Sequence, residues 1–340
     1  MKKGLTTLLV FTLLLFLSAA PATAKILRYA LIVPNWSGDY AGAVAMAKYV
    51  KEKTNGDLDI RIFPASQLGG SMTMTQQVQA GTLDLCTASS STLQNTVPQV
   101  AVLDLPFIWP NIENVMGVLN DAEFQDRLNT LLNKKGMVFL GYGQNDWRGL
   151  TNSKRPVRKP EDMEGMKIRV QQSPIYLDSF KLLGVNPVPM AFGEVYQALQ
   201  QGVIDGQDNA AWVSAMMKFT EVNKYVTELG HSFQIALVVM NLDLWNRLSP
   251  KQRQIIREGA KVGFEENLKH TQKIKNDIPN SGGKSYEQIL KENGCELIKL
   301  TPEERQVFAD KLKPIWVKYS TFIGKDFYDF FMAKRAQYSK

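Results

Sequence analysis

The chain has 340 residues, with 40 Lys and Arg against 33 Asp and Glu, a net charge of +7 and 44% hydrophobic residues. A charged fraction of 21% is typical of a globular rather than a disordered chain, and this length favours two domains. The two Cys and two His (His231 and His270) exclude a disulfide-rich scaffold and a metal site built from several His.

Residues 1–24 have the pattern of a signal peptide. Lys2 and Lys3 precede an apolar stretch at residues 8–17, and Ala22-Thr23-Ala24 forms a small-x-small cleavage site. The alternative is a membrane anchor, but the apolar stretch is shorter than the roughly 20 residues that span a bilayer. We therefore expect export and cleavage after Ala24. Removing these 24 residues, two of them Lys, would leave 316 residues and lower the net charge from +7 to +5.

The remaining Lys and Arg are spread along the chain beside Asp or Glu. A nucleic-acid-binding protein concentrates its basic residues on one face, so we expect no nucleic-acid partner.

The first hundred residues alternate between strand and helix patterns. In chain order we predict a strand at 26–33, a helix at 43–50, a strand at 58–62, a helix at 71–80 capped by Ser71 and ended by Gly81, and a strand at 83–88. Strands alternating with helices indicate a parallel sheet flanked by helices.

A similar unit follows later in the chain. It has a strand at 167–170, a helix at 176–183, an extended stretch at 185–190 and a helix at 194–201. Its helix ends in QQGVID (200–205), which resembles QAGTLD (79–84) in the first unit. The similarity indicates two related α/β lobes, although one helix-glycine-strand junction is a common feature by itself.

The last third of the chain is predicted to be mostly helical. Capping boxes with a Pro in the first turn start at Ser249 and Thr301. The aromatic residues between 319 and 331 are expected to dock on a lobe.

Common catalytic and cofactor motifs are missing from the sequence. Gly141-Tyr142-Gly143 begins like a dinucleotide-binding loop, but Asp146 occupies the third glycine position, so we assign these glycines to a turn, and Gln144 to Asp146 are also turn-prone. Neither a phosphate loop nor a zinc-protease or serine-hydrolase motif occurs. We predict no cofactor and no metal site, with an exported enzyme as an alternative.

Three polar residues suggest a site for an organic anion. Arg169 lies in an apolar strand, and Arg148 and Asn209 flank the same region. An arginine fork matches a carboxylate in geometry and charge, and Asn can donate and accept hydrogen bonds. The alternative for Arg169 is an internal salt bridge with Glu161, Asp162 or Glu164.

Five stretches of the chain resemble the solute-binding proteins of tripartite ATP-independent periplasmic (TRAP) transporters, of the DctP type. They are FPASQLGG (63–70), LPF (105–107), GMKIRV (165–170), PMAFGEVYQALQ (189–200) and DGQDN (205–209). They occur in the family's order and extend over essentially the whole mature chain.

The resemblance implies a periplasmic, two-lobed α/β binding protein whose lobes are mixed, mostly parallel sheets flanked by helices, with a long helix spanning both. We expect lobe I at 25–146 plus about 235–274, and lobe II at 147–234 plus about 275–340. Such a protein, expected to be a monomer, delivers an organic acid to the small and large membrane subunits of a permease. An ATP-cassette-type binding protein is a second alternative.

The resemblance also implies a set of ligand-binding residues. Arg169 corresponds to the family's carboxylate-binding arginine, Arg148 to a second arginine, and Phe192 to an aromatic residue that covers the ligand. Asn209 corresponds to the pocket asparagine, although Ala210 replaces the proline that usually follows.

Two departures from the family pattern bear on the ligand. Family members that bind polyhydroxylated acids commonly carry acidic residues where this chain has Ser71 and Ser89, which makes a heavily hydroxylated sugar acid a poor candidate. Trp36, Trp147 and Trp212 could line a more apolar pocket or serve only in packing. Cys86 and Cys295 could form a disulfide in an oxidising compartment or remain free.

Overall fold

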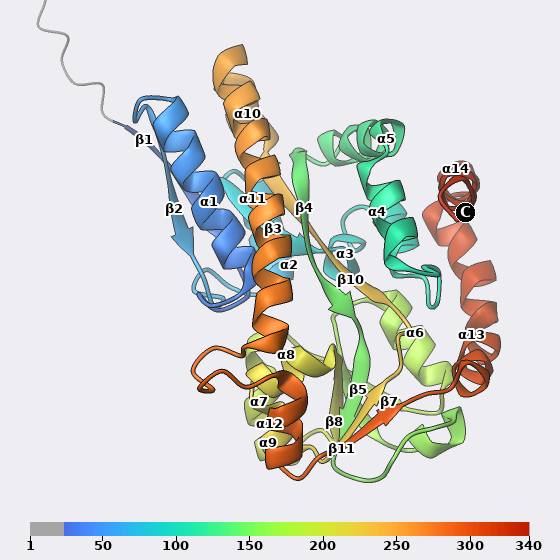
Figure 1. Ribbon diagram of the computed structural model, residues 1–340. Coiled ribbons are helices and arrows are strands. Elements are labelled where there is room, and N and C mark those ends of the chain that lie inside the picture. Colours follow the sequence, from blue (N-terminus) through green and yellow to red (C-terminus); the bar gives the residue numbers. More distant parts are fainter. Residues whose placement is uncertain (1–23, 340) are drawn as a thin grey trace, which may run out of the picture.

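The computed structural model describes residues 24–339, which form two mixed β-sheets flanked by helices (Figure 1). This arrangement confirms the predicted two-lobed α/β fold. The predicted signal peptide lies, except for Ala24, outside the described residues, so its cleavage stays a prediction. Of the helices described, none is long and apolar enough to cross a membrane.

The sheet of lobe I has five strands. In spatial order they are β2 (Leu58–Phe63), β1 (Lys25–Ala30), β3 (Leu85–Ser89), β10 (Phe233–Asn241) and β4 (Met137–Trp147). The first three are parallel, and β10 runs antiparallel to both of its neighbours.

The sheet of lobe II has six strands. Their order is β11 (Glu296–Lys299), β9 (Tyr225–Glu228), β5 (Gly149–Asn152), β8 (Gly206–Asn209), β6 (Lys167–Val170) and β7 (Asn186–Pro189). Here β7, β6 and β8 are parallel, and β5 runs antiparallel to β8 and β9.

Helices connect and cover these strands. They are α1 (Gly38–Lys53), α2 (Ser71–Gln79), α3 (Ser90–Leu93), α4 (Ile112–Asn120), α5 (Ala122–Asn133), α6 (Pro174–Leu182), α7 (Val195–Gln200), α8 (Ala211–Met216), α9 (Phe219–Val222), α10 (Leu242–Arg247), α11 (Pro250–Asn276), α12 (Tyr286–Glu292), α13 (Pro302–Ile323) and α14 (Lys325–Gln337). Short 3₁₀ helices lie at Pro98–Asp104, Pro160–Met163 and Phe192–Glu194.

The two similar sequence units form the same substructure. Strands β1, β2 and β3 with α1 and α2 have the order 2-1-3, and β6, β7 and β8 with α6 and α7 repeat it as 7-6-8. The Asp84 carboxylate accepts the backbone N–H of Arg28 in β1 at 2.8 Å, and the Asp205 carboxylate accepts that of Lys167 in β6 at 2.8 Å. The two acidic residues therefore tie equivalent strands together in both lobes.

Two of the points where the chain crosses between the lobes are adjacent. Arg148 alone separates β4 from β5, and residues 229–232 lead from β9 back to β10. Backbone hydrogen bonds join the crossings, from Arg148 N to Ser232 O (2.8 Å) and from Gly230 N to Arg148 O (2.9 Å). Arg148 thus occupies the junction of the two sheets.

Helix α11 runs beside α1 and leads from lobe I toward α12 in lobe II (Figure 1). The two helices approach closely at paired glycines, since a Cβ on Gly42 would lie 2.5 Å from Gly263 O and one on Gly263 would lie 2.7 Å from Gly42 O. Capping boxes at Ser249 and Thr301 start α11 and α13, as predicted.

The aromatic C-terminal segment docks as expected, and its last helix, α14, packs on α4. Phe331 is fully buried, with its ring centroid 5.4 Å from that of Trp109 and 6.0 Å from that of Phe124. The exact lobe boundaries given above stay a prediction.

Two local predictions were wrong. Residues 141–146 are part of strand β4 and not a turn, because they pair with β10. Gly143 is needed there for space, since a Cβ would lie 2.5 Å from Asp39 Oδ1. Ser71 does not cap α2, whose N-cap is Gly70. The Ser71 hydroxyl instead bonds to Thr92 Oγ1 (2.6 Å) and accepts the Ser89 N–H (3.1 Å).

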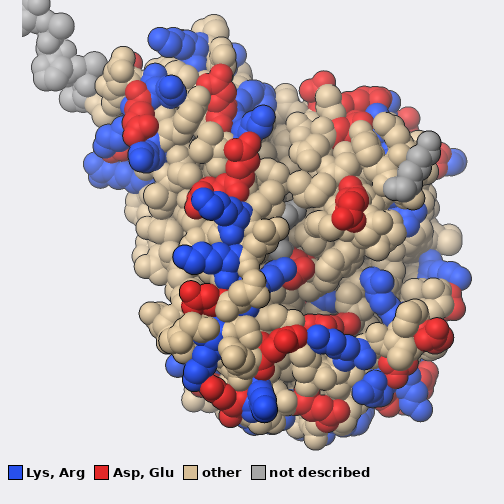
Figure 2. Space-filling model, viewed as in Figure 1, with Lys and Arg blue, Asp and Glu red and all other residues tan. Residues whose placement is uncertain are grey.

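The structure shows the state of the two cysteines and the distribution of charge on one face. Cys86 lies in β3 of the lobe I sheet, Cys295 directly precedes β11 of the lobe II sheet, and both are free thiols. On the face shown in Figure 2, basic and acidic side chains are interspersed.

Candidate ligand-binding pocket

A pocket lies between the lobes, where the carboxyl ends of their parallel strands meet. Lobe I contributes residues after β1 (32–39), after β2 (Ser71) and at the end of β3 (87–92). Lobe II contributes residues after β6 (171–172), after β7 (190–192) and from the end of β8 through α8 (209–217), as well as Arg169. Ligands of open α/β sheets bind at this edge.

The pocket is small. The volume of the cavity is about 80 Å³, several times the roughly 10–15 Å³ that one water requires. The pocket therefore has room for a small organic molecule.

Arg169 is the basic residue of the pocket and is only 3% exposed. Its Nε and Nη2 donate to the carbonyl oxygen of Met190 at 3.0 and 2.8 Å, which fixes the plane of the guanidinium. Its Nη1 has no hydrogen-bond partner among the described residues. Burial, together with the positive charge of Arg148, lowers the pKa of Arg169 to about 9, so it stays protonated at neutral pH.

The internal salt bridge considered for Arg169 does not form with the nearby acids. Glu161 lies 3.7 Å from Lys311 Nζ, and Asp162 accepts two backbone N–H groups. Arg169 thus presents an unpaired buried cation to the pocket.

Arg148, by contrast, lies outside the pocket lining. It is 1% exposed, and its Nη2 is 2.9 Å from the carboxylate of Asp208, which is fully buried. Its Nη1 donates to Oε1 of Gln234, a pocket residue. The structure therefore places Arg148 behind the pocket, in contact with its floor.

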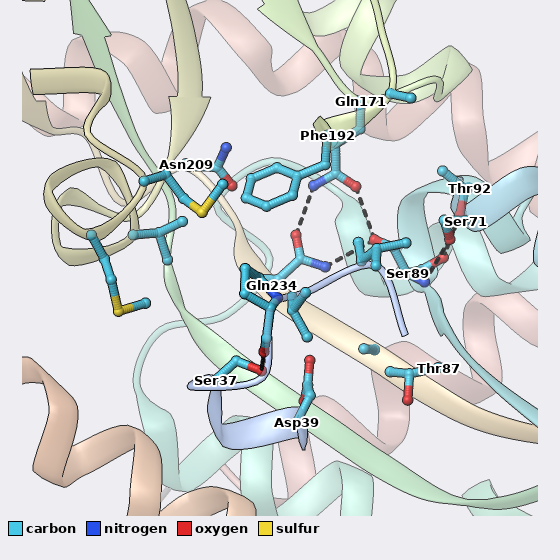
Figure 3. Close-up of a pocket in the computed structure, with 18 of the residues that line it drawn as sticks. Ser37, Asp39, Ser71, Thr87, Ser89, Thr92, Gln171, Phe192, Asn209 and Gln234 are labelled. Carbon is cyan, nitrogen blue, oxygen red and sulfur yellow. Dashed lines mark hydrogen bonds between the residues drawn. The ribbon is translucent and has the colours of Figure 1, made fainter. Parts of the chain in front are cut away.

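Two glutamines form this floor. The Gln171 amide lies 2.8 Å from Ser89 Oγ and 2.7 Å from Gln234 Oε1, and Gln234 Nε2 donates to Ser89 Oγ at 2.8 Å (Figure 3). Because Gln171 comes from lobe II and the other two from lobe I, this network joins the lobes directly under the pocket.

The other predicted site residues all line the pocket: Asn209, Phe192, Trp212, Trp36, Ser89 and Ser71. Trp212 is 4% exposed, and its Nε1 donor has no partner among the described residues. Asn209 Nδ2 donates to Gln207 Oε1 at 2.7 Å. Trp147 lies elsewhere, with its ring centroid 5.2 Å from that of Phe233.

Sequence reasoning missed several lining residues, of which Asp39 is the most consequential. Asp39 is 9% exposed, and its Oδ1 accepts a hydrogen bond from Asn267 Nδ2 in α11. Burial raises its pKa to about 6, although the Asn267 bond acts in the opposite direction. The available signal was its position shortly after a predicted strand, the same signal that applies to Gln171.

No cluster of three or more His, Cys, Asp or Glu side chains suited to a metal ion occurs within residues 24–339. His231 is buried 3.4 Å from Asp208, and burial lowers its pKa to about 4. It does not line the pocket.

Comparisons with known proteins agree with this geometry. A family model for bacterial extracellular solute-binding proteins, family 7 (DctP), matches residues 30–321. The chain is 32% identical over 295 residues to the 2,3-diketo-L-gulonate-binding periplasmic protein YiaO of Escherichia coli, with 87% of each chain covered.

Solved structures of TRAP periplasmic solute-binding proteins have the same fold. One from Bordetella bronchispeptica, with density interpreted as pantoate, is 31% identical with a TM-score of 0.81, covering 90% of this chain and 98% of that one. One from Shewanella oneidensis with bound succinate is 26% identical with a TM-score of 0.83, covering 92% and 99%.

These matches confirm the resemblance seen in the sequence motifs and decide against an ATP-cassette-type binding protein and an exported enzyme. The chain belongs to the DctP family of TRAP periplasmic solute-binding proteins, whose role is to bind a solute and not to transform it.

Proposed function

We propose that this protein captures a small organic acid by its carboxylate at Arg169 and delivers it to the small and large membrane subunits of a TRAP permease. The observation that carries the proposal is the buried Arg169 Nη1, a cationic donor without a partner among the described residues. A buried charge is costly unless it is paired, and a ligand carboxylate would pair it. The compounds named for the three relatives above are all carboxylates.

The other pocket residues would hold the body of the acid. Trp212 Nε1 and Asn209 offer polar contacts beside Arg169, whereas Phe192 and Trp36 offer aromatic surface. Ser71 and Ser89 would face the ligand from lobe I. We assign Arg148 a positioning role, because its guanidinium is already bound to Asp208 and reaches the pocket only through Gln234.

Ligand binding would favour closure of the lobes, because only the closed form offers contacts from both sides. Direct hydrogen bonds between the lobes support this view: Gln94 Nε2 donates to Ser173 Oγ (2.8 Å) and Asn95 Nδ2 donates to Gln172 O (2.9 Å). These bonds would stabilise the closed form together with the ligand.

The carboxylate assignment is tested by a thermal-shift screen of organic acids, followed by calorimetry on Arg169→Gln. Charge-assisted hydrogen bonds contribute about 1.5–3 kcal/mol each, so the variant should bind at least about tenfold more weakly. Arg61→Gln, at an exposed position of β2, is the control and should bind as the wild type does. Unchanged affinity in Arg169→Gln, or a response to neutral sugars alone, would refute the assignment.

Export and delivery have their own tests. The intact mass of the protein from its native host should correspond to a chain starting at Lys25, and light scattering should give the mass of a monomer. Uptake of the acid into vesicles should require both the binding protein and the TRAP membrane subunits. Uptake with the membrane subunits alone would contradict the delivery role.

A further inference from the structure

The pocket contains two charged side chains among the described residues, and they come from different lobes. Arg169 belongs to β6 in lobe II, and Asp39 belongs to the first turn of α1 in lobe I. In Figure 3, Asp39 lies across the pocket from Phe192 and Gln171, and Gln171 follows Arg169 by two residues. The other lining residues are uncharged.

Asp39 is a buried carboxylate without a counter-ion. Only its Oδ1 accepts a hydrogen bond from a described residue, the amide of Asn267, and none of the ion pairs between described residues includes Asp39. With a pKa of about 6, it remains mainly ionised at neutral pH. A buried carboxylate with a free oxygen requires a hydrogen-bond donor or a cation.

The helix explains only part of this arrangement. An acidic residue in the first turn of α1 interacts favourably with the helix dipole, which helps the position tolerate a negative charge. The helix dipole does not explain why the Asp39 carboxylate faces a ligand pocket. It also does not explain why position 143 is a glycine, where a Cβ would displace Asp39 Oδ1. Asn267 and Gly143 together hold the carboxylate in one place.

The pocket wall contributed by lobe II is largely apolar. Its apolar side chains include those of Met190, Phe192, Trp212, Met216 and Met217. The other arginine nearby, Arg148, is paired with Asp208 outside the lining. A second carboxylate on the ligand would therefore find no free cation and would be repelled by Asp39.

We propose that Asp39 selects monocarboxylates that carry a hydrogen-bond donor, either a hydroxyl or an ammonium group, away from the carboxylate, and that it rejects dicarboxylates. The inference rests on the proposed function, because the ligand carboxylate is taken to bind Arg169. The donor would occupy the free oxygen of Asp39 and form a charge-assisted hydrogen bond. A dicarboxylate would instead place two like charges in a poorly solvated space.

A series of acids that differ only at the far end tests this selectivity. Butyrate, 4-hydroxybutyrate, 4-aminobutyrate and succinate, with their five- and six-carbon homologues, would be measured by calorimetry at neutral pH. For the wild type we expect the hydroxy or amino acid to bind about tenfold or more tightly than the unsubstituted acid, and the dicarboxylate to bind most weakly. Preference for the hydroxy acid over the amino acid, or the reverse, identifies which donor is recognised.

Asp39→Asn removes the charge while keeping the size of the side chain and its acceptor for Asn267. We expect the ratio of the Kd values for dicarboxylate and donor-bearing acid to fall at least about tenfold in this variant. Asp57→Asn, at an exposed position before β2, should leave the ratio unchanged. If Asp39→Asn does not fold, the wild-type series still decides between the two outcomes.

Two results would overturn the inference. The first is a wild-type protein that binds the dicarboxylate more tightly than the other acids of the same chain length. The second is an Asp39→Asn variant with the same ratio of Kd values for dicarboxylate and donor-bearing acid as the wild type. In either case, loss of binding in Arg169→Gln would leave the carboxylate function standing. If no carboxylate bound the wild type, the proposed function would fail together with the inference.

Discussion

Replacing Arg148 by Met should destabilise the protein much more than a surface substitution does. Arg148 and Asp208 are 1% and 0% exposed, with Nη2 2.9 Å and Nε 3.0 Å from the Asp208 carboxylate. Removing one partner of a buried pair leaves an uncompensated charge and costs about 3–5 kcal/mol. We therefore expect the free energy of unfolding to fall by about that amount.

Urea denaturation of the unliganded protein, followed by tryptophan fluorescence, measures this loss. Arg158→Met is the matched control, because its ion pair with Glu304 at 3.3 Å is partly exposed and should contribute at most about 1 kcal/mol. Replacing Asp208 by Asn in the Arg148→Met background should recover part of the stability, since it removes the unpaired charge. If Arg148→Met unfolded at the same urea concentration as the wild type, the buried pair would not stabilise the fold and this reasoning would be refuted.

Three further predictions concern stability and thiol chemistry. Burial lowers the pKa of His231 to about 4, below its ordinary value of about 6.5. Protonation of His231 therefore favours the unfolded state, and the stability contributed by the neutral imidazole is lost as the pH falls from about 6.5 to about 4. Burial raises the pKa of Asp39 to about 6 and that of Asp104 to about 7, and these shifts change stability with pH in the opposite direction. The contribution of His231 is therefore measured as the difference in unfolding free energy between wild type and His231→Gln at each pH. The same pH dependence in both proteins would contradict the prediction. Gly263→Ala should lower the free energy of unfolding by about 1–3 kcal/mol, because the new methyl group would clash with the backbone of α1. Gly193→Ala is the control and should change the free energy of unfolding by less than about 0.5 kcal/mol, because the space around Gly193 is open. Equal effects of the two substitutions in urea denaturation would refute the close packing of α1 and α11. Burial raises the pKa of Cys86 to about 12, so a thiol reagent should leave Cys86 unmodified in the native protein and label both cysteines after unfolding, and a disulfide found by mass spectrometry would contradict the free thiols.

The elements that the sequence predicted best are those set by local periodicity and local chemistry. The strand-helix alternation, the glycines that end α2 and α7, and the capping boxes at Ser249 and Thr301 each depend on residues within a few positions of one another. Arg169 could also be singled out, because a charged residue inside an apolar strand needs a specific reason to be there.

The features that were missed depend on residues far apart in the chain. In the sequence, Asp39 has the pattern of an acidic residue at the start of a helix. Only the fold brings it beside Asn267, which lies 228 positions later. The partner of Arg148 lies 60 positions away, so the sequence suggested a ligand contact and gave no sign of the internal pair. Gly143 reads as a turn residue until Asp39 is placed opposite it.

The duplicated architecture shows how the pocket became asymmetric. Because Asp84 holds Arg28 and Asp205 holds Lys167 in the same way, Ala30 in β1 is the counterpart of Arg169 in β6. The strand pairing agrees, since Ala30 lies opposite Cys86 and Arg169 lies opposite Gln207, each two positions after its anchoring Asp. Ala30 is fully buried among apolar residues, where an arginine would have neither space nor a partner. In lobe I this position holds a core residue, Ala30, whereas in lobe II it holds the pocket cation, Arg169. The pocket anion, Asp39, comes from a different position, the start of α1. The polarity of the pocket therefore follows from different side chains placed on two copies of one scaffold.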